Sequence, residues 1–283
     1  MQKITSKILF NYKTIKMTQS RLNKGLLAIP VSLIDYFPKQ KGKIYITTGT
    51  NDKVSAKTFT PYTSSSRECR IGGMRGFYEK ADLKDGDEIV IQILDTNKYR
   101  IITEKQFENV VKRTEKEFDE SESEAVASAK LEAISKIVSA TPKETLWSEY
   151  YRLTKMEIKK RRPRMAKPRE AKETAPSSIR KLLTEIYDGK CQITGFGFLM
   201  DNGKPYFEIH HIKSELGNHI KNILVVSPNI HAQFTYAFVR EFFDNDGWLR
   251  RVKFNDRTFV VNHIIDKIPK KFEKEVHFES QKS

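Results

Sequence analysis

Cysteine is scarce in this chain, and long apolar runs do not occur. The only two cysteines, Cys69 and Cys191, lie far apart and support neither a disulfide framework nor a cysteine-rich zinc module. No run approaches the roughly 18 apolar residues of a membrane span. Residues 1–16 intersperse lysine with apolar residues and lack the continuous apolar core of a signal peptide. These absences predict a cytoplasmic protein with reduced thiols.

Negative charge is also in short supply. The chain has 51 Lys and Arg against 36 Asp and Glu, which gives a net charge of +15 and a pI near 9.6. A balance of this size favours a polyanionic partner. A membrane partner is not expected, because no basic helix carries a clear Trp, Phe and Leu face.

The length of 283 residues predicts about two domains. The first hundred residues favour β structure, with strands expected over 44–48, 54–60, 88–94 and 99–103. Several short strands separated by turns indicate a small barrel or sandwich. From about residue 104 to residue 155, apolar residues recur with the 3.6-residue period of a helix.

This helical stretch is broken at Thr141-Pro142, and a basic segment follows it. Residues 155–172 hold nine Lys or Arg and only two Glu. Such a segment is either a solvated linker or an arm that contacts phosphates. A further helix is expected from Ser177-Ser178, which can cap its start, to Asp188-Gly189.

Four of the six histidines fall between residues 210 and 231. Three of them stand in a fixed order with one asparagine: Glu208-Ile209-His210-His211-Ile212, then Asn222, then His231. Imidazole is the commonest metal ligand, and its ordinary pKa lies near neutral pH. The group can therefore supply both a metal site and a base, whereas His219, His263 and His277 are interpreted as structural. Glu208 is interpreted as a structural strand residue or as an acceptor that orients a ligand, rather than as a metal ligand itself.

The expected local order around these residues is strand, strand, helix. Residues 189–195 predict a strand edge and a turn, and Asp201-Asn202-Gly203-Lys204 predicts a hairpin turn. Strands are expected over 206–212 and 222–226. A helix should begin at Pro228 and include His231, Phe234, Phe238 and Phe242.

The same residues resemble the HNH (ββα-metal) nuclease family over about residues 178–245. The matching segments are residues 191–195 (Cys-Gln-Ile-Thr-Gly), residues 208–212 and residues 222–231. The resemblance implies that His210 and His231 bind Mg²⁺ or Mn²⁺ and that His211 is the general base. It also implies that Asn222 orients the loop or His211, and that the products carry a 5′-phosphate. Cys191 lacks a partner cysteine, so no structural zinc is expected.

Phosphodiester hydrolysis requires these kinds of residue. A neutral histidine can take a proton from water. A divalent ion can bind the phosphoryl and leaving oxygens, and two protein ligands leave open coordination positions for them. A group on the other ring nitrogen of His211 would fix its tautomer, and Asn222 or a backbone carbonyl could do so.

Residues 20–95 are similar to the B-three pseudobarrel of plant transcription factors, which restriction endonucleases of the EcoRII type use as an effector or recognition domain. The similarity lies in residues 21–30, 37–38, 70–77 and 83–87, with Gly-Met-Arg-Gly-Phe where Gly-Trp-x-x-Phe is usual. A swapped-hairpin barrel of the bacterial transition-state regulator type is an alternative. The resemblance places DNA-reading arms near residues 16–24 and 62–70.

Arg pairs well with guanine, and Asn or Gln with adenine. Each candidate can instead contact a phosphate or be a plain surface residue. The candidate DNA-reading residues are Gln19, Arg21, Asn23, Lys24, Ser65, Arg67 and Arg70.

We therefore expect an α+β protein. Its parts are an N-terminal β pseudobarrel over 1–105, a helical connector with a basic linker over 106–176, and a ββα-metal nuclease domain over 177–283. The resemblances imply a type II restriction endonuclease of the bacterial cytoplasm that cuts double-stranded DNA, with a cognate DNA methyltransferase in the same cell. A homodimer is expected, with the helical segment as candidate dimer surface, because one site cuts one strand. The alternatives are a homing or mobile-element nicking endonuclease and a DNA-binding regulator with a non-catalytic module.

Overall fold

The structure is a computed structural model that describes residues 13–50, 53–61, 69–138, 140–158 and 175–269. These residues form two compact units. Unit 1 comprises the described residues up to Arg113 together with 136–138, and unit 2 comprises 114–135 and 140–269. No described helix is long and apolar enough to cross a bilayer.

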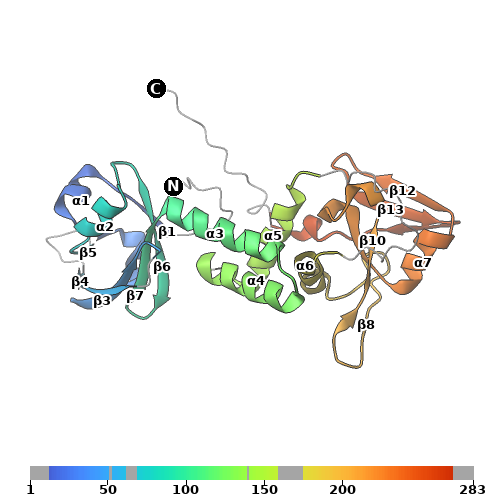
Figure 1. Ribbon diagram of the computed structural model, residues 1–283, viewed down its shortest axis with the longest axis horizontal. Helices are drawn as coiled ribbons and strands as arrows, with labels where there is room; N and C mark the ends of the chain where they lie inside the picture. The colour runs from blue at the N-terminus through green and yellow to red at the C-terminus, as the bar shows by residue number, and fades with distance from the viewer. Residues whose placement is uncertain (1–12, 51–52, 62–68, 139, 159–174, 270–283) are drawn as a thin grey trace, which may run out of the picture. The chain divides into compact units, whose positions relative to one another are not determined.

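Unit 1 is built on a seven-stranded sheet in the order β1-β6-β7-β3-β4-β5-β2. The sheet curls into a nearly closed barrel (Figure 1). The expected strands and the mixed α+β class with a barrel-like N-terminal sheet are confirmed. The strands are β1 (Lys13–Lys16), β2 (Leu27–Ile29), β3 (Gly42–Thr48), β4 (Val54–Thr60), β5 (Cys69–Ile71), β6 (Glu88–Asp95) and β7 (Lys98–Thr103).

The core of unit 1 is aromatic where the strands meet. The ring of Phe37 stacks on Tyr99 at 4.4 Å and on Phe59 at 5.6 Å between centroids. The Tyr99 hydroxyl donates to the carbonyl oxygen of Tyr36 at 2.7 Å, so the one polar atom of this stack is satisfied. Short helices cover the unit: α1 (Gln19–Lys24), the 3-10 helix η1 (Val31–Tyr36) and α2 (Arg75–Lys80).

The arm expected over residues 16–24 is a helix and not an open loop. Helix α1 ends at Gly25, which adopts a left-handed conformation with φ 61° and donates to the carbonyl oxygens of Arg21 and Leu22. Leu22 packs against the core of the barrel. One partly buried leucine and a glycine cap are enough to define six helical residues, which is too short a run for a periodic pattern to appear.

The expected helical stretch consists of α3 (Glu104–Asp119), α4 (Glu124–Val138) and α5 (Pro142–Thr154). Thr141-Pro142 is the start of α5. The Thr141 hydroxyl accepts from the amide of Glu144, and the Glu144 carboxylate accepts from the amide of Thr141. The boundary between the two units falls within α3 and α4, so these helices are divided between the units.

Helix α6 (Ser177–Tyr187) begins at Pro176, and neither serine caps it. The hydroxyls of Ser177 and Ser178 instead donate to the carbonyl oxygens of Glu122 and Asp119. The two serines therefore attach the start of α6 to the end of α3 within unit 2. Asp188 and Gly189 end the helix in left-handed conformations, as expected.

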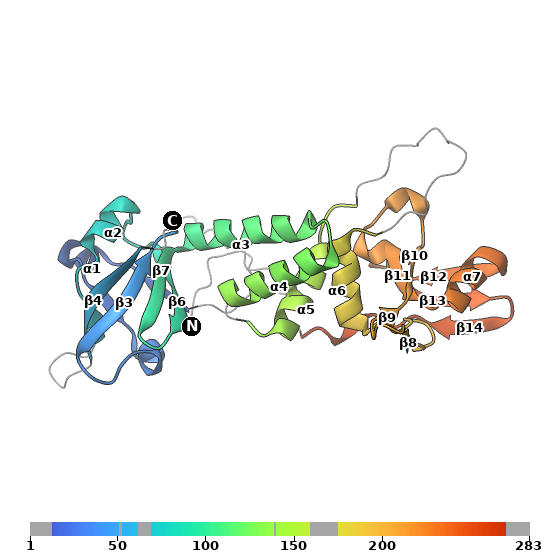
Figure 2. The same cartoon turned by 60° about the horizontal axis from the view of Figure 1, so that its bottom comes forward.

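Three small sheets follow α6, one of which is the pair β10 and β11 (Figure 2). Residues 189–195 form turns and not the expected strand edge. The helix that begins at Pro228 ends at Tyr236, so Phe238 and Phe242 are not helical. The elements are β8 (Phe198–Leu199), β9 (Pro205–Tyr206), β10 (Glu208–His211), η2 (Ser214–Leu216), η3 (Ile220–Asn222), β11 (Ile223–Val226), α7 (Pro228–Tyr236), β12 (Val239–Phe243), β13 (Leu249–Phe254), β14 (Arg257–Val260) and η4 (Ile264–Lys267).

The buried side chain of Gln192 joins three segments of unit 2. Its oxygen accepts from the amide of Val225 at 2.8 Å. Its nitrogen donates to the Tyr187 hydroxyl at 3.1 Å and to the carbonyl oxygen of Asn262 at 3.0 Å. Cys191, 2% exposed, lies beside it in an apolar core with Leu224 and Val252. The end of α6, strand β11 and the segment after β14 are thereby held together.

A first prediction concerns Gly189, which combines a φ of +62° with close approach to Pro205. A Cβ at this position would overlap Pro205 Cβ and lie 3.1 Å from its Cγ. At Gly203, with φ +74°, an added Cβ would have no heavy atom within 4 Å. Gly189→Ala should therefore lower the free energy of unfolding by about 1–3 kcal/mol more than Gly203→Ala in urea titrations. Both variants share the strain of the left-handed backbone conformation. Equal losses of the free energy of unfolding would therefore contradict the predicted clash at Gly189.

Candidate active site

The site is built on the antiparallel pair β10 and β11. Glu208 pairs with Val226, His210 with Leu224 and His211 with Ile223. Alternation along β10 directs Glu208 and His210 to one side of the hairpin and His211 to the other. Helix α7, which carries His231, contacts β10. The structure therefore places Glu208 and His210 on the side of the hairpin opposite to His211, with the helix that carries His231 against the same strand.

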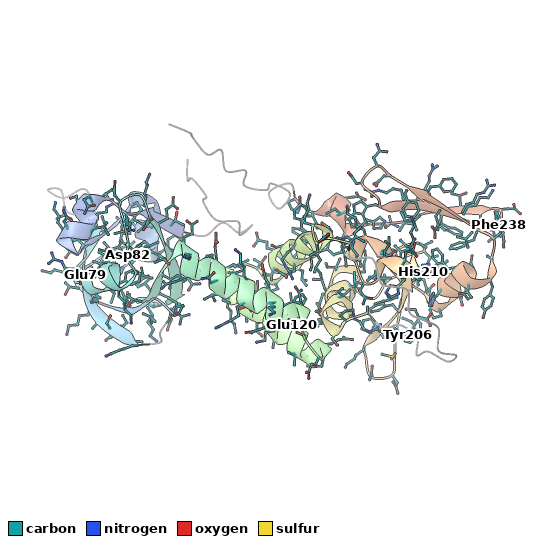
Figure 3. The ribbon with its side chains drawn as sticks, turned by 45° about the horizontal axis from the view of Figure 1, so that its top comes forward. Glu79, Asp82, Glu120, Tyr206, His210 and Phe238 are labelled. Carbon is teal, nitrogen blue, oxygen red and sulfur yellow. The ribbon has the colours of Figure 1, made fainter. Side chains whose placement is uncertain are left out.

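His210 lies between two side chains of α7. Its ring stacks on Phe234 with 3.8 Å between centroids, and the His231 ring stands edge-on to it at 5.5 Å. Figure 3 shows His210 among the strands of unit 2. Burial, with smaller contributions from the charges of His231 and His211, lowers the pKa of His210 from 6.5 to about 4. The ring is therefore neutral at neutral pH, which is the form that coordinates a metal.

His231 is held by Glu208. Its Nδ1 contacts the Glu208 carboxylate, whose other oxygen accepts from the Tyr206 hydroxyl at 3.2 Å. A carboxylate at Nδ1 places the proton there and leaves Nε2 available to a ligand. Of the two roles left open for Glu208, the contact supports that of an acceptor that orients a ligand.

His211 has a different neighbour from the one expected. Its Nε2 lies 2.8 Å from Oδ1 of Asn218, and no hydrogen bond from Asn222 to the ring is present among the described residues. An acceptor at Nε2 assigns the proton to that nitrogen and leaves the lone pair on Nδ1. Asn218 was not among the predicted site residues. The only feature of the sequence that pointed to it was its position next to Gly217, in the loop between the two strands.

Asn222 holds the loop and does not touch the base. The side chain is 4% exposed and makes three hydrogen bonds. Its Oδ1 accepts from the amide of Lys213 at 2.9 Å, and its Nδ2 donates to the carbonyl oxygens of Lys213 and Gly217, both at 2.8 Å. Of the two roles expected for Asn222, the contacts support orientation of the loop.

The other histidines of the described chain have structural contacts. His219 lies with Nε2 3.0 Å from the carbonyl oxygen of Met156, and its Nδ1 accepts from the amide of Lys221. His263 is buried with Nε2 2.7 Å from the carbonyl oxygen of Leu249, and its ring packs on Trp248. Burial lowers the pKa of both. His277 lies outside the described residues.

The donor set of His210 and His231 fits one divalent ion with an open coordination sphere. Both are nitrogen donors from different elements, one partly buried and neutral and the other with its tautomer fixed by a carboxylate. Within the described residues, no three His, Cys, Asp or Glu side chains converge as a closed metal cluster. Imidazole donors favour transition ions such as Mn²⁺ over Mg²⁺, which prefers oxygen.

The candidate DNA-reading residues are spread over α1 and β5. The Gln19 amide donates to Asn23 at 2.8 Å, and the Arg21 guanidinium donates to the carbonyl oxygen of Lys16 at 2.8 Å. Lys24 and Arg70 are exposed. Ser65 and Arg67, like most of the basic segment 155–172, lie outside the described residues.

No protein-family model matches the chain, and no curated protein matches it. Solved structures that are similar to part of it include the following two. One is an Arabidopsis FUS3–DNA complex, with 19% identity over 32% of this chain and 94% of that chain and a TM-score of 0.28. The other is the N-terminal domain of Helicobacter pylori LlaJI.R1, with 12% identity over 32% of this chain and 85% of that chain and a TM-score of 0.27.

A second prediction follows from the lowered pKa of His210. Between pH 6.5 and about 4 the unfolded state binds the proton more strongly than the folded state. The free energy of unfolding should therefore fall as the pH drops through this window, with no further contribution from His210 below it. Urea titrations with a chelator present measure this effect, and His210→Gln should show a shallower fall. Parallel pH curves for the two proteins would refute the assignment.

Proposed function

We propose that this protein is a site-specific DNA endonuclease of the restriction type, with an HNH-like site in unit 2. The observation that carries the proposal is the arrangement at β10, where two imidazoles suited to a metal lie on one side and His211 on the other. A net charge of +15 supports a polyanionic substrate. Mn²⁺ or Mg²⁺ is the proposed cofactor.

Each residue has a separate task in the proposed reaction. His211 accepts a proton from the attacking water at Nδ1, because Asn218 occupies Nε2. His210 and His231 would hold the divalent ion, and Glu208 orients His231. Asn222 keeps the loop that carries Asn218 in place. The ion, when bound, neutralises charge on the phosphoryl group and the leaving oxygen.

Unit 1 is the proposed sequence-reading part. Its B-three-like sequence features and the exposed side chains of Lys24 and Arg70 support contact with DNA. One site hydrolyses one strand, so the proposal includes a homodimer for cleavage of both strands. Linear product from supercoiled plasmid supports this form of the proposal, and nicked circles alone support the nicking alternative.

The third prediction tests the base. His211→Ala should reduce the rate of cleavage by about 10²–10⁴-fold, the usual contribution of a general base, and leave the dissociation constant for DNA unchanged. Plasmid cleavage with Mn²⁺ or Mg²⁺ and electrophoretic binding assays measure the two effects. Asp201→Ala, at the exposed β8–β9 turn, is the matched control and should retain activity. Undiminished cleavage by His211→Ala would exclude this mechanism.

The fourth prediction tests the role of Asn218 as a positioning residue. Asn218→Ala should lower kcat with little change in KM, because the tautomer of His211 is no longer fixed. Asn218→Asp should move the acidic limb of the pH–rate profile to higher pH, because a carboxylate favours the protonated imidazole. A residue that only stabilises the loop would lower activity in both variants without moving that limb.

A further inference from the structure

The sheet β12-β13-β14 has one buried side and one exposed side. The pairing aligns Arg240 with Lys253 and Thr258, and Phe242 with Arg251 and Val260. Aligned residues on neighbouring strands project to the same side. The row between them contains Val252, which is fully buried, so these two rows form the outer side of the sheet. We call the six residues the outer face: Arg240, Phe242, Arg251, Lys253, Thr258 and Val260.

The acidic residue of this sheet lies off the outer face. The outer face carries three cations and no acidic residue. Glu241 lies in the inner row, where burial raises the pKa of its carboxyl group and the nearby Lys213 opposes that rise. Asp244, after the end of β12, is paired with Arg250 at 2.6 Å. Among the described residues, no carboxylate pairs with the cations of the outer face.

Aromatic rings hold the two guanidinium groups of the outer face. Arg240 lies over Phe238 at 5.8 Å and Arg251 over Phe242 at 5.3 Å from the ring centroids. Phe238 is 63% exposed and Val260 62%, so this face is open to solvent within unit 2. Guanidinium groups placed on rings retain their outward donors for phosphate oxygens.

The chemistry of this face fits one occupant best. A second copy of the same face would bring like charges together across a twofold axis. A phosphate backbone is complementary to the three cations, and aromatic rings tolerate contact with sugars and bases. We propose that the outer face of β12–β14 binds the sugar–phosphate backbone of DNA. This inference rests on the proposed function.

The position of the face determines which part of the DNA it contacts. Phe254, from the inner side of the sheet, packs edge-on against Phe234 at 4.9 Å, and Phe234 stacks on His210. The outer face therefore points away from the proposed metal ligands, and Figure 3 shows Phe238 apart from His210. The DNA bound here flanks the cleaved phosphate and is not the segment that enters the site.

The fifth prediction tests this surface with the triple variant Arg240→Gln/Arg251→Gln/Lys253→Gln. His211→Ala is added to every protein so that binding is measured without cleavage. The probes are two duplexes centred on a mapped cut site, one of about one helical turn and one about three turns longer. Loss of three phosphate contacts should reduce the slope of log K against log salt by about 2.7 on the long duplex. Between about 50 and about 200 mM salt, wild-type affinity should then fall about 40-fold more than that of the variant.

Two control variants isolate the surface. Lys116→Gln/Lys143→Gln/Lys267→Gln removes the same charge from exposed positions of unit 2 and should keep the wild-type slope. Arg240→Lys/Arg251→Lys should also keep it, because the charge that displaces counterions is retained. Matching melting temperatures show that all variants are folded.

The outcomes separate this inference from the proposed function. Wild-type protein that neither binds nor cuts DNA overturns both. If the wild type cuts DNA and the triple Gln variant keeps the wild-type slope on the long duplex, only the outer face is wrong. If the triple Gln variant reduced the salt slope equally on the short and long duplexes, the contact would lie at the cleaved segment. That result would overturn the assignment of the outer face to flanking DNA. A change of oligomeric state in sedimentation would make the face a subunit interface and overturn DNA binding there.

Discussion

The buried amide of Asn222 is the contact on which the rest of the site depends. Its three hydrogen bonds tie the loop between β10 and β11 to Asn222 at two points, Lys213 near the start of the loop and Gly217 in its middle. The next residue in that loop is Asn218, which meets His211. A buried polar atom without its partner costs about 1–3 kcal/mol, so the loop has a strong preference for this one conformation. Asn222 thus acts on His211, the proposed base, through Asn218.

A second buried amide supports the hairpin from the other side. Gln192 binds Val225 of β11, Tyr187 at the end of α6 and Asn262 after β14. Cys191 packs in the adjacent apolar core and provides no polar anchor of this kind. Asn222 comes directly before β11, which is only four residues long, and Gln192 binds Val225 within the strand. Buried hydrogen bonds at both places restrain the strand and its side chains.

The sequence predicted what depends on local pattern and failed where tertiary pairing decides. Four strands of unit 1 (β3, β4, β6 and β7) and the helices from Glu104 to Thr154 follow from periodicity and residue type, whereas β1, β2 and β5 were not predicted. Phe234, Phe238 and Phe242 recur at helical spacing, yet Phe238 pairs with Asn255 and ends the helix. The contact of Asn218 with His211 could not be predicted, because it depends on how Asn222 folds the loop.

Two electrostatic requirements of the proposed DNA-cutting site conflict, and the fold places the groups that meet them apart. The proposed ligand His210 must be neutral, and burial beside two other imidazoles keeps it so. Phosphate binding needs fixed positive charge. Such charge attracts anions but repels a metal cation bound nearby. The cations of β12–β14 stand on the side of the sheet that faces away from the Phe254–Phe234–His210 stack. In the proposed reaction, the cations of β12–β14 can therefore bind the DNA at a place remote from the metal ligands. The ion, when bound, provides the positive charge at the reacting phosphate.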